Sequence, residues 1–117
     1  MSTLDSISTP TGSGFREITP RAAAAHLSAV RILDVREVSE FNDALGHIAG
    51  AELVPLATVP LRLGELDRTA PTLVVCRSGG RSGRGASLLA AAGFTAVYNL
   101  AGGMLAWNAE GLPTTRS

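Results

Sequence analysis

The chain has 117 residues, ten basic and ten acidic side chains, and a formal net charge of zero. This length suits one domain with a single core, and 45% hydrophobic with 17% charged residues is typical of a globular chain. The balanced charge argues against a nucleic-acid partner, and the absence of a run of about 18 apolar residues argues against a membrane partner.

A single cysteine, Cys76, excludes an intramolecular disulfide, and no CxxC or HExxH pattern predicts a metal site. The first residues, MSTLDSISTPTGSG, lack the basic and apolar segments of a secretory signal. We expect a protein of a reducing compartment, most simply the cytoplasm, that needs neither a metal nor an organic cofactor.

The first part of the chain contains a tail followed by a helix, a strand, a second helix and a second strand. Residues 1–14 are rich in Ser, Thr and Gly and show no periodicity, so they predict a flexible tail before a domain of residues 15–117. Thr19 and Pro20 predict the N-cap and first residue of a helix. The segments that follow predict a strand at 32–35, a short helix within 38–45 that is capped by Ser39, and a strand at 52–56.

The second part contains the strongest strand, TLVVC, at residues 72–76, whose continuous apolar run predicts burial on both faces. A helix that ends at Gly93, a strand at 94–100 and a helix at 102–111 follow. Alternating strands and helices predict an α/β domain with a mostly parallel sheet. Cys76 ends its strand on the side where such sheets form their reactive crevice.

The loop that follows, CRSGGRS at 76–82, has the composition of an anion cradle. Glycines allow a tight turn that aims N–H groups inward, and the next helix adds its positive N-terminal end. A thiol in this field should ionise below the ordinary cysteine pKa of about 8.5. Cys76 is therefore the candidate nucleophile, and the candidate anion-binding residues are Arg77 at the entrance, Ser78, Gly79, Gly80, and Arg81 closing the cradle.

Two other interpretations of this loop remain. A lone buried cysteine often only fills core space, but the glycine–arginine loop favours a reactive thiol. A phosphate-binding loop of the GxxxxGK[ST] type is disfavoured because the pattern is missing and the chain has no lysine.

Five segments in this order resemble a single-domain rhodanese, over about residues 15–113: LDVRE, GHIAGA, VVCRSGGRS, GF and NLAGGMLAW. The resemblance implies a rhodanese-like fold, a five-stranded mostly parallel sheet flanked by helices, with a persulfide-forming cysteine after the fourth strand. Asp34 and Arg36 match the family's DxR, and we expect them to form an ion pair or to brace the loop. The sequence departs from the family in four residues between Phe41 and Gly46, where two are more usual.

The resemblance implies a thiosulfate-type sulfurtransferase that moves a sulfane sulfur through a Cys76 persulfide. Its partners would be a small anionic sulfur donor and a thiol or cyanide acceptor. The alternative is a sulfur-relay module that exchanges persulfide sulfur with a partner protein. Related phosphatases and arsenate reductases have C-x5-R loops; the C-x4-R spacing from Cys76 to Arg81 makes that chemistry the less favoured one.

Overall fold

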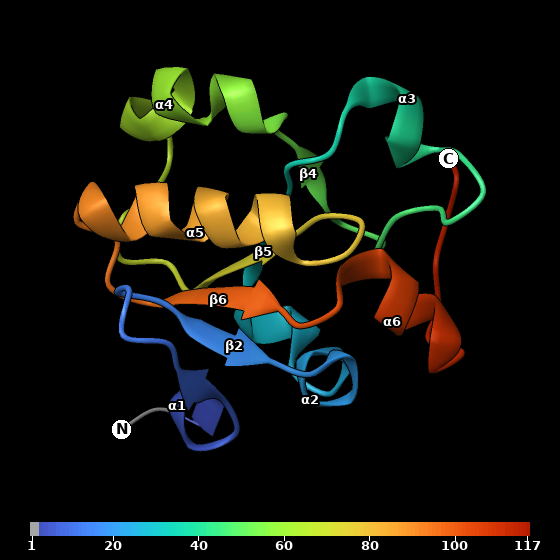
Figure 1. The fold of residues 1–117 in the computed structure, drawn as a ribbon, viewed down its shortest axis with the longest axis horizontal. Helices are drawn as coiled ribbons and strands as arrows, with labels where there is room; N and C mark the ends of the chain where they lie inside the picture. The colour runs from blue at the N-terminus through green and yellow to red at the C-terminus, as the bar shows by residue number, and fades with distance from the viewer. Residues whose placement is uncertain (1–2) are drawn as a thin grey trace.

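The computed structural model describes residues 3–117, which fold around one sheet of strand order β1-β2-β6-β5-β3-β4 (Figure 1). Every neighbouring pair is parallel except β1–β2. The expected mostly parallel sheet is confirmed, with a short antiparallel strand added at one edge. The strands are β1 (Thr9–Pro10), β2 (Arg16–Ile18), β3 (Arg31–Asp34), β4 (Glu52–Leu53), β5 (Thr72–Val75) and β6 (Val97–Leu100).

Helices cover both faces of this sheet, α4 and α5 on one and α2 and α6 on the other (Figure 1). No helix of the described residues is long and apolar enough to cross a membrane. The helices are α1 (Thr3–Ser6), α2 (Pro20–Ala24), α3 (Val38–Phe41), α4 (Val59–Arg62), α5 (Gly80–Ala91) and α6 (Gly103–Ala109), with 3₁₀ turns at Leu27–Ala29, Leu56–Thr58 and Leu63–Glu65.

The alternation of side chains along β5 divides the core into two clusters. Leu73 and Val75 pack on the side of α2 and α6, with Trp107 and other buried residues. Val74 and Cys76 pack on the opposite side, under α5. Both faces of β5 are buried, as its continuous apolar run predicts, and Cys76 lies on the α5 side at the carboxyl end of the strand.

The start of the domain agrees with the sequence at one position and differs at two. Thr19 caps α2 by accepting the N–H of Ala22, with Pro20 as the first helical residue, as expected. Glu37, not Ser39, caps α3, because its carboxylate forms a capping box with Glu40. The sequence pattern also missed β2, which at three residues is too short to show alternation.

The segment predicted to be a flexible tail has defined contacts from Thr3 onward. Leu4 is buried in the cluster beneath α2, and the Tyr98 hydroxyl donates to Asp5 Oδ1 at 2.7 Å. β1 pairs with β2. Leu4 is the one buried apolar residue of the described part of this segment, and a single residue gives no periodic signal. The domain boundary at residue 15 and the flexibility of the segment stay predictions.

Candidate active site

Cys76 lies at the bottom of the loop between β5 and α5, with only 1% of the residue exposed. Its Sγ accepts the backbone N–H of Gly79 at 3.0 Å and lies 3.3 Å from the Ser82 hydroxyl oxygen. The backbone conformation of Gly79, with φ +107°, turns that N–H inward and caps α5. The direct hydrogen-bond contacts of the sulfur come from Gly79 and Ser82, and the role of the loop as an anion cradle stays a prediction.

The N-terminus of α6 holds this loop from behind. Met104 N–H donates to the Cys76 carbonyl at 2.9 Å, and Leu105 N–H donates to the Arg77 carbonyl at 3.0 Å. These bonds point the two carbonyls away from the sulfur, which leaves the N–H side of the loop facing it. The close approach needs Gly103, which has φ +59° and whose Cβ, if present, would lie 2.5 Å from the Cys76 carbonyl oxygen.

The environment lowers the pKa of the Cys76 thiol below its ordinary value. Burial is the largest single influence and raises the pKa, but hydrogen bonds to the sulfur from the Ser82 hydroxyl and from the backbone amides of Ser82, Gly79 and Ser78 together outweigh it. Their combined effect favours the thiolate, which is the nucleophilic form of cysteine.

The Arg81 side chain is bound by a carboxylate of α3, and its expected role of closing the cradle stays a prediction. Its guanidinium forms a bidentate ion pair with Glu40 of α3, with nitrogen–oxygen distances of 2.7 and 2.8 Å. The Arg81 guanidinium, with the Glu37 amide, holds the pKa of Glu40 at about 2, against partial burial that raises it. A carboxylate of matching geometry captures the arginine, so Arg81 connects α3 to the start of α5.

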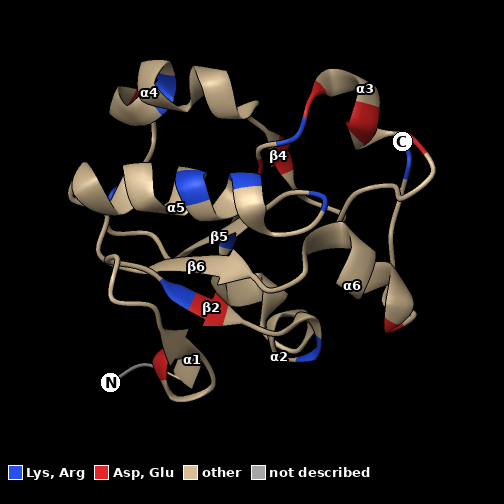
Figure 2. Ribbon diagram, in the orientation of Figure 1, with Lys and Arg blue, Asp and Glu red and all other residues tan. Residues whose placement is uncertain are grey.

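Arg77, Ser78 and Gly80 are the exposed members of the loop. Arg77 borders a hollow of about 250 Å³ that is also lined by Arg36, Glu40, Asp43, Ala44 and Leu45. In Figure 2, basic residues mark the loop and α5, and acidic residues mark α3. Gly80 has no left-handed backbone conformation and open space where a Cβ would stand, so the turn depends on Gly79 rather than on both glycines.

The ion pair expected between Asp34 and Arg36 is present and completely buried, with a shortest distance of 2.7 Å. Arg36 also donates to the carbonyls of Gly46 and Glu40, at 2.8 and 3.3 Å. Each charged atom is thereby satisfied, which buried ions require. The pair fixes the segment from α3 to Gly46 beside the site and does not contact the Cys76 sulfur.

The four residues between Phe41 and Gly46 form a loop that the C-terminal segment supports. His47 and Thr115 exchange two backbone hydrogen bonds of 2.8 Å. Arg116 donates to the carbonyls of Asp43 and Ala44. His47 Nδ1 lies 2.9 Å from the Phe41 carbonyl oxygen. The extra residues thus build one wall of the hollow beside Arg77.

A polar chain that the sequence analysis missed extends from the sulfur across β6 to β2. Ser82 contacts Asn99 of β6, and the Asn99 amide contacts Glu17 of β2. Asn99 lies within a segment of the rhodanese resemblance, but nothing in its spacing indicates a contact with the loop. Strand pairing brings it there, since Asn99 is opposite both Glu17 and Val74 in the sheet.

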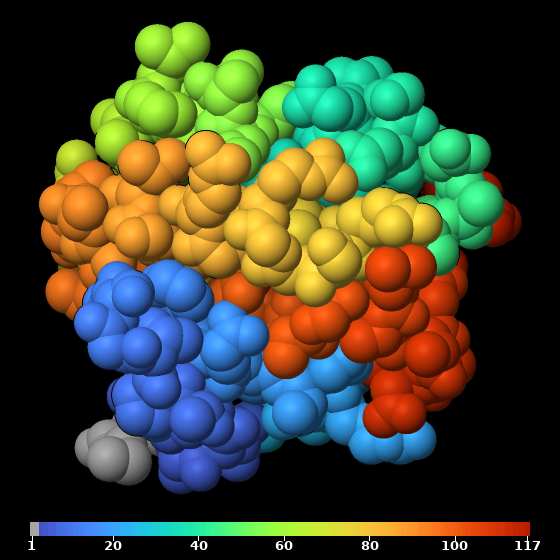
Figure 3. Space-filling model, viewed as in Figure 1, coloured from blue at the N-terminus to red at the C-terminus, as the bar shows by residue number. Residues whose placement is uncertain are grey.

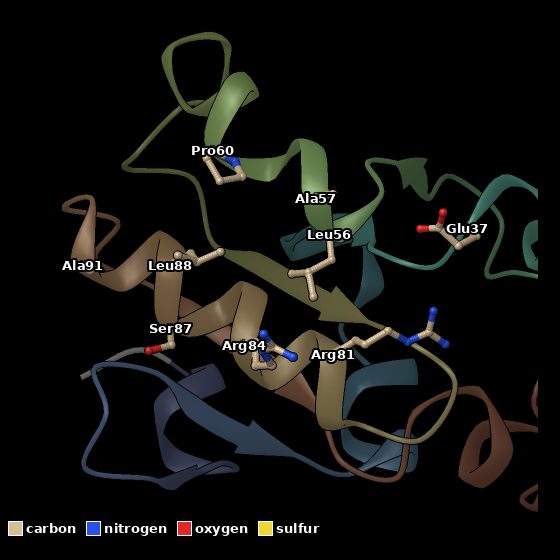
Figure 4. Close-up of a pocket in the computed structure, with 9 residues that line it drawn as sticks. All are labelled: Glu37, Leu56, Ala57, Pro60, Arg81, Arg84, Ser87, Leu88 and Ala91. Carbon is tan, nitrogen blue, oxygen red and sulfur yellow. The ribbon is translucent and has the colours of Figure 1, made fainter.

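A second depression, a groove of about 830 Å³, lies between α4 and α5 (Figure 4). Leu56 and Leu88 point into it from its two sides, and Arg81 and Glu37 stand at the end toward the active-site loop. In Figure 3 the loop before α5, in yellow, is visible at the surface between the α3 segment in teal and α6 in red. The groove and the loop therefore open on neighbouring parts of the surface.

Several known proteins are similar to this chain in amino-acid sequence. The chain is 36% identical to a sulfurtransferase of Allochromatium vinosum, over 72% of this chain and 77% of that protein. It is 35% identical to the thiosulfate sulfurtransferase GlpE of Pseudomonas entomophila, over 81% and 86%. It is 37% identical to the putative sulfur carrier protein YrkF of Bacillus subtilis, over 70% of this chain but only 43% of that protein.

Comparison with solved structures leads to the same group of proteins. A rhodanese-related protein of Thermoplasma volcanium superposes with a TM-score of 0.82 at 27% identity, over 88% of this chain and all of that one. The family model for the rhodanese-like domain matches residues 19–110, which contain the Cys76 loop, Ser82 and Asn99, whereas Glu17 lies just before the match. The chain belongs to the rhodanese-like domain family.

Proposed function

We propose that this protein is a sulfurtransferase that moves a sulfane sulfur from thiosulfate, or a similar anionic donor, to a thiophilic acceptor through a persulfide on Cys76. The observation that carries the proposal is the environment of Sγ. Cys76 directly follows β5, and its sulfur accepts a hydrogen bond from the Gly79 N–H. The hydrogen bonds of the loop lower the pKa of its thiol. Sulfurtransferase relatives at 35–36% identity support the same chemistry.

In the first half-reaction the Cys76 thiolate attacks the outer sulfur of thiosulfate. A sulfur–sulfur bond forms to Sγ while the donor's own sulfur–sulfur bond breaks, and sulfite leaves with the electron pair. The terminal persulfide sulfur carries the negative charge and needs hydrogen-bond donors around it. The inward-facing side of the loop supplies them, because Met104 and Leu105 hold the carbonyls of Cys76 and Arg77 on the other side.

In the second half-reaction a thiolate or cyanide attacks the terminal sulfur and takes it away. The bond to Sγ breaks, and its electron pair regenerates the Cys76 thiolate. Two half-reactions that share a covalent intermediate give ping-pong kinetics. Neither step needs a cofactor. A thiol that must stay reduced between turnovers also fits the proposed location in a reducing compartment, such as the cytoplasm.

Mass spectrometry after incubation with thiosulfate tests the proposal. We expect the intact protein to gain one sulfur atom and to lose it on addition of cyanide, with thiocyanate as product. Cys76→Ser is the matched control, since its hydroxyl is too weakly acidic to act as a nucleophile here. A mass gain in that variant, or no gain in the wild type at saturating thiosulfate, would contradict the persulfide mechanism.

A sulfur relay with a partner protein is the second candidate function. The groove between α4 and α5 favours it, because its apolar residues Leu56 and Leu88 lie close to the active-site loop and suit a protein partner. A relative named a putative sulfur carrier protein points in the same direction. Rapid sulfur transfer from a protein persulfide together with slow turnover of thiosulfate would favour the relay.

Phosphatase or arsenate-reductase chemistry is the less favoured alternative. The C-x4-R loop is one residue shorter than those enzymes use, and the Arg81 guanidinium is held in a bidentate ion pair by Glu40. We expect no hydrolysis of para-nitrophenyl phosphate above the rate of Cys76→Ser.

A further inference from the structure

The orientation of the Asn99 side-chain amide is fixed by its neighbours. One end of the amide lies 2.6 Å from a Glu17 carboxylate oxygen and 3.2 Å from the Gly79 carbonyl oxygen. A carbonyl oxygen only accepts hydrogen bonds, as does a carboxylate, so the atom that faces both must be the NH₂ donor. The amide oxygen of Asn99 therefore faces Ser82.

This orientation determines where the Ser82 hydroxyl proton lies. Ser82 Oγ has one proton and three acceptors in reach: the Asn99 amide oxygen, the Gly79 carbonyl and the Cys76 sulfur. The contact with Asn99 is the shortest, and the amide oxygen has no proton to contribute to it. The hydroxyl thus donates its proton to Asn99 and turns a lone pair toward Cys76. A neutral Cys76 thiol can donate its S–H to that lone pair.

A thiolate requires the opposite arrangement, because it has no proton and only accepts. When the thiol loses its proton to water, the Ser82 hydroxyl rotates toward Sγ and leaves the Asn99 oxygen without its donor. The thiolate and the amide compete for one proton. Ser82 and Asn99 are both buried, at 0% and 3% exposure, so water does not readily replace the lost partner.

We propose that Asn99 is a positioning residue that holds the Ser82 hydroxyl proton away from Cys76 while the thiol is neutral and yields it to the sulfur when the thiol ionises. Asn99 thereby limits how readily the thiolate forms, and Glu17 and the Gly79 carbonyl keep its amide in the required orientation. The inference concerns the thiol of the proposed sulfur chemistry, but it is a statement about proton equilibria and can be measured without any sulfur donor.

Other charged side chains lie around the same loop, and Asn99→Leu leaves each of them in the chain. They come from every element around the loop: Arg77 in the loop, Arg81 on α5, Glu40 on α3, the Asp34–Arg36 pair after β3, and Glu17 on β2. The first turn of α6 has no charged side chain. A substitution of Asn99 by a neutral residue removes none of these charges, although it takes the amide donor away from the Glu17 carboxylate.

The decisive variant is Asn99→Leu, which has a similar volume and no acceptor. We expect a roughly tenfold larger ionisation constant of the Cys76 thiol, a lowered pKa, because the Ser82 hydroxyl becomes free to serve the thiolate. The measurement is a pH titration of the ultraviolet absorbance of the thiolate, which reports a single group because the chain has one cysteine. General loosening of the loop would weaken the amide bonds to the sulfur and give the opposite sign.

Ser82→Ala provides the matched background. By itself it should raise the thiol pKa, since it removes a donor to the thiolate. Combined with Asn99→Leu it should show no further change, because Asn99 acts through the hydroxyl. An unchanged or raised pKa in folded Asn99→Leu, or an equal lowering in the Ser82→Ala background, would overturn the proposal.

A second variant keeps the test open if Asn99→Leu does not fold, as judged by circular dichroism. Asn99→Asp combined with Glu17→Gln restores a donor to the new carboxylate and gives the Ser82 proton a stronger acceptor. We expect a higher thiol pKa than in Glu17→Gln alone, partly because the new carboxylate repels the thiolate directly, and we expect Ser82→Ala to remove the part of the difference that acts through the hydroxyl. A fall, or a rise that Ser82→Ala leaves intact, would contradict the role of Asn99.

Discussion

Gly103→Ala is the substitution that most directly tests how α6 shapes the active-site loop. The added Cβ would stand 2.5 Å from the Cys76 carbonyl oxygen and 2.6 Å from the Arg77 carbonyl. Ordinary contact of a Cβ begins at 3.4 Å, so the backbone of the loop or of α6 must move by about 0.9 Å. No flexible side chain is available to absorb this movement, because the contacts are with backbone atoms.

The expected loss has two parts. A left-handed conformation costs a non-glycine residue about 1–2 kcal/mol, and weakening the bonds from Met104 and Leu105 to the loop costs about 0.5–1.5 kcal/mol each. The free energy of unfolding should therefore fall by roughly 2–5 kcal/mol, which corresponds to a Tm lower by about 10–20 °C. A displacement of about 1 Å at the nucleophile should also reduce kcat about 100-fold.

Gly111→Ala is the matched control. Gly111 also has a left-handed backbone, with φ +70°, but nothing lies within 4 Å of a Cβ built there. It should lose only the conformational part of the stability, about 1–2 kcal/mol, and keep the wild-type kcat. The assays are thermal unfolding and thiosulfate:cyanide sulfur transfer, measured at a temperature where every variant is folded. A folded Gly103→Ala protein with wild-type kcat would refute the reasoning that α6 sets the geometry of the loop.

Three further predictions concern charge. Arg77→Ala should raise the KM for thiosulfate more than it lowers kcat, with partial recovery in Arg77→Lys; an effect confined to kcat in steady-state kinetics would contradict an anion-binding role. The ion pair of Glu40 with Arg81 stabilises the fold fully above pH 4.5, and this stabilisation is lost as the pH falls through the Glu40 pKa of about 2. Between these two pH values the free energy of unfolding of Glu40→Gln should therefore fall less steeply than that of the wild type. Denaturant unfolding measures this, and equal pH slopes for the two proteins would contradict a role for the pair. The pKa of the Cys76 thiol lies below the ordinary value, so ionisation of this thiol stabilises the fold above the ordinary thiol pKa, and this stabilisation is lost as the pH falls through the lowered pKa. The rate of Cys76 alkylation should therefore reach its plateau at a lower pH than for a free cysteine. An inflection at or above the free-cysteine pKa of about 8.5 would mean that the loop does not activate the thiol.

The sequence by itself determined the features that depend on neighbouring residues in the chain. The buried run before Cys76, the Thr19–Pro20 helix start and the glycine after the strand are local signals, and the structure has each of them at the predicted place. Asp34 and Arg36 are two residues apart, so their ion pair is also a short-range consequence. Such features follow from backbone preference and side-chain reach within a few residues.

Only the tertiary structure decided which groups surround the sulfur. Arg81 lies five residues after Cys76, yet its side chain pairs with Glu40, 41 residues earlier in the chain. Asn99 and Glu17, separated by 82 residues, become neighbours because β2 pairs with β6. Gly103 reaches the back of the loop only because α6 packs there. An arginine side chain can turn toward any carboxylate within its reach, and strand pairing has no signature in a single segment, so these contacts depend on the folded arrangement of distant elements.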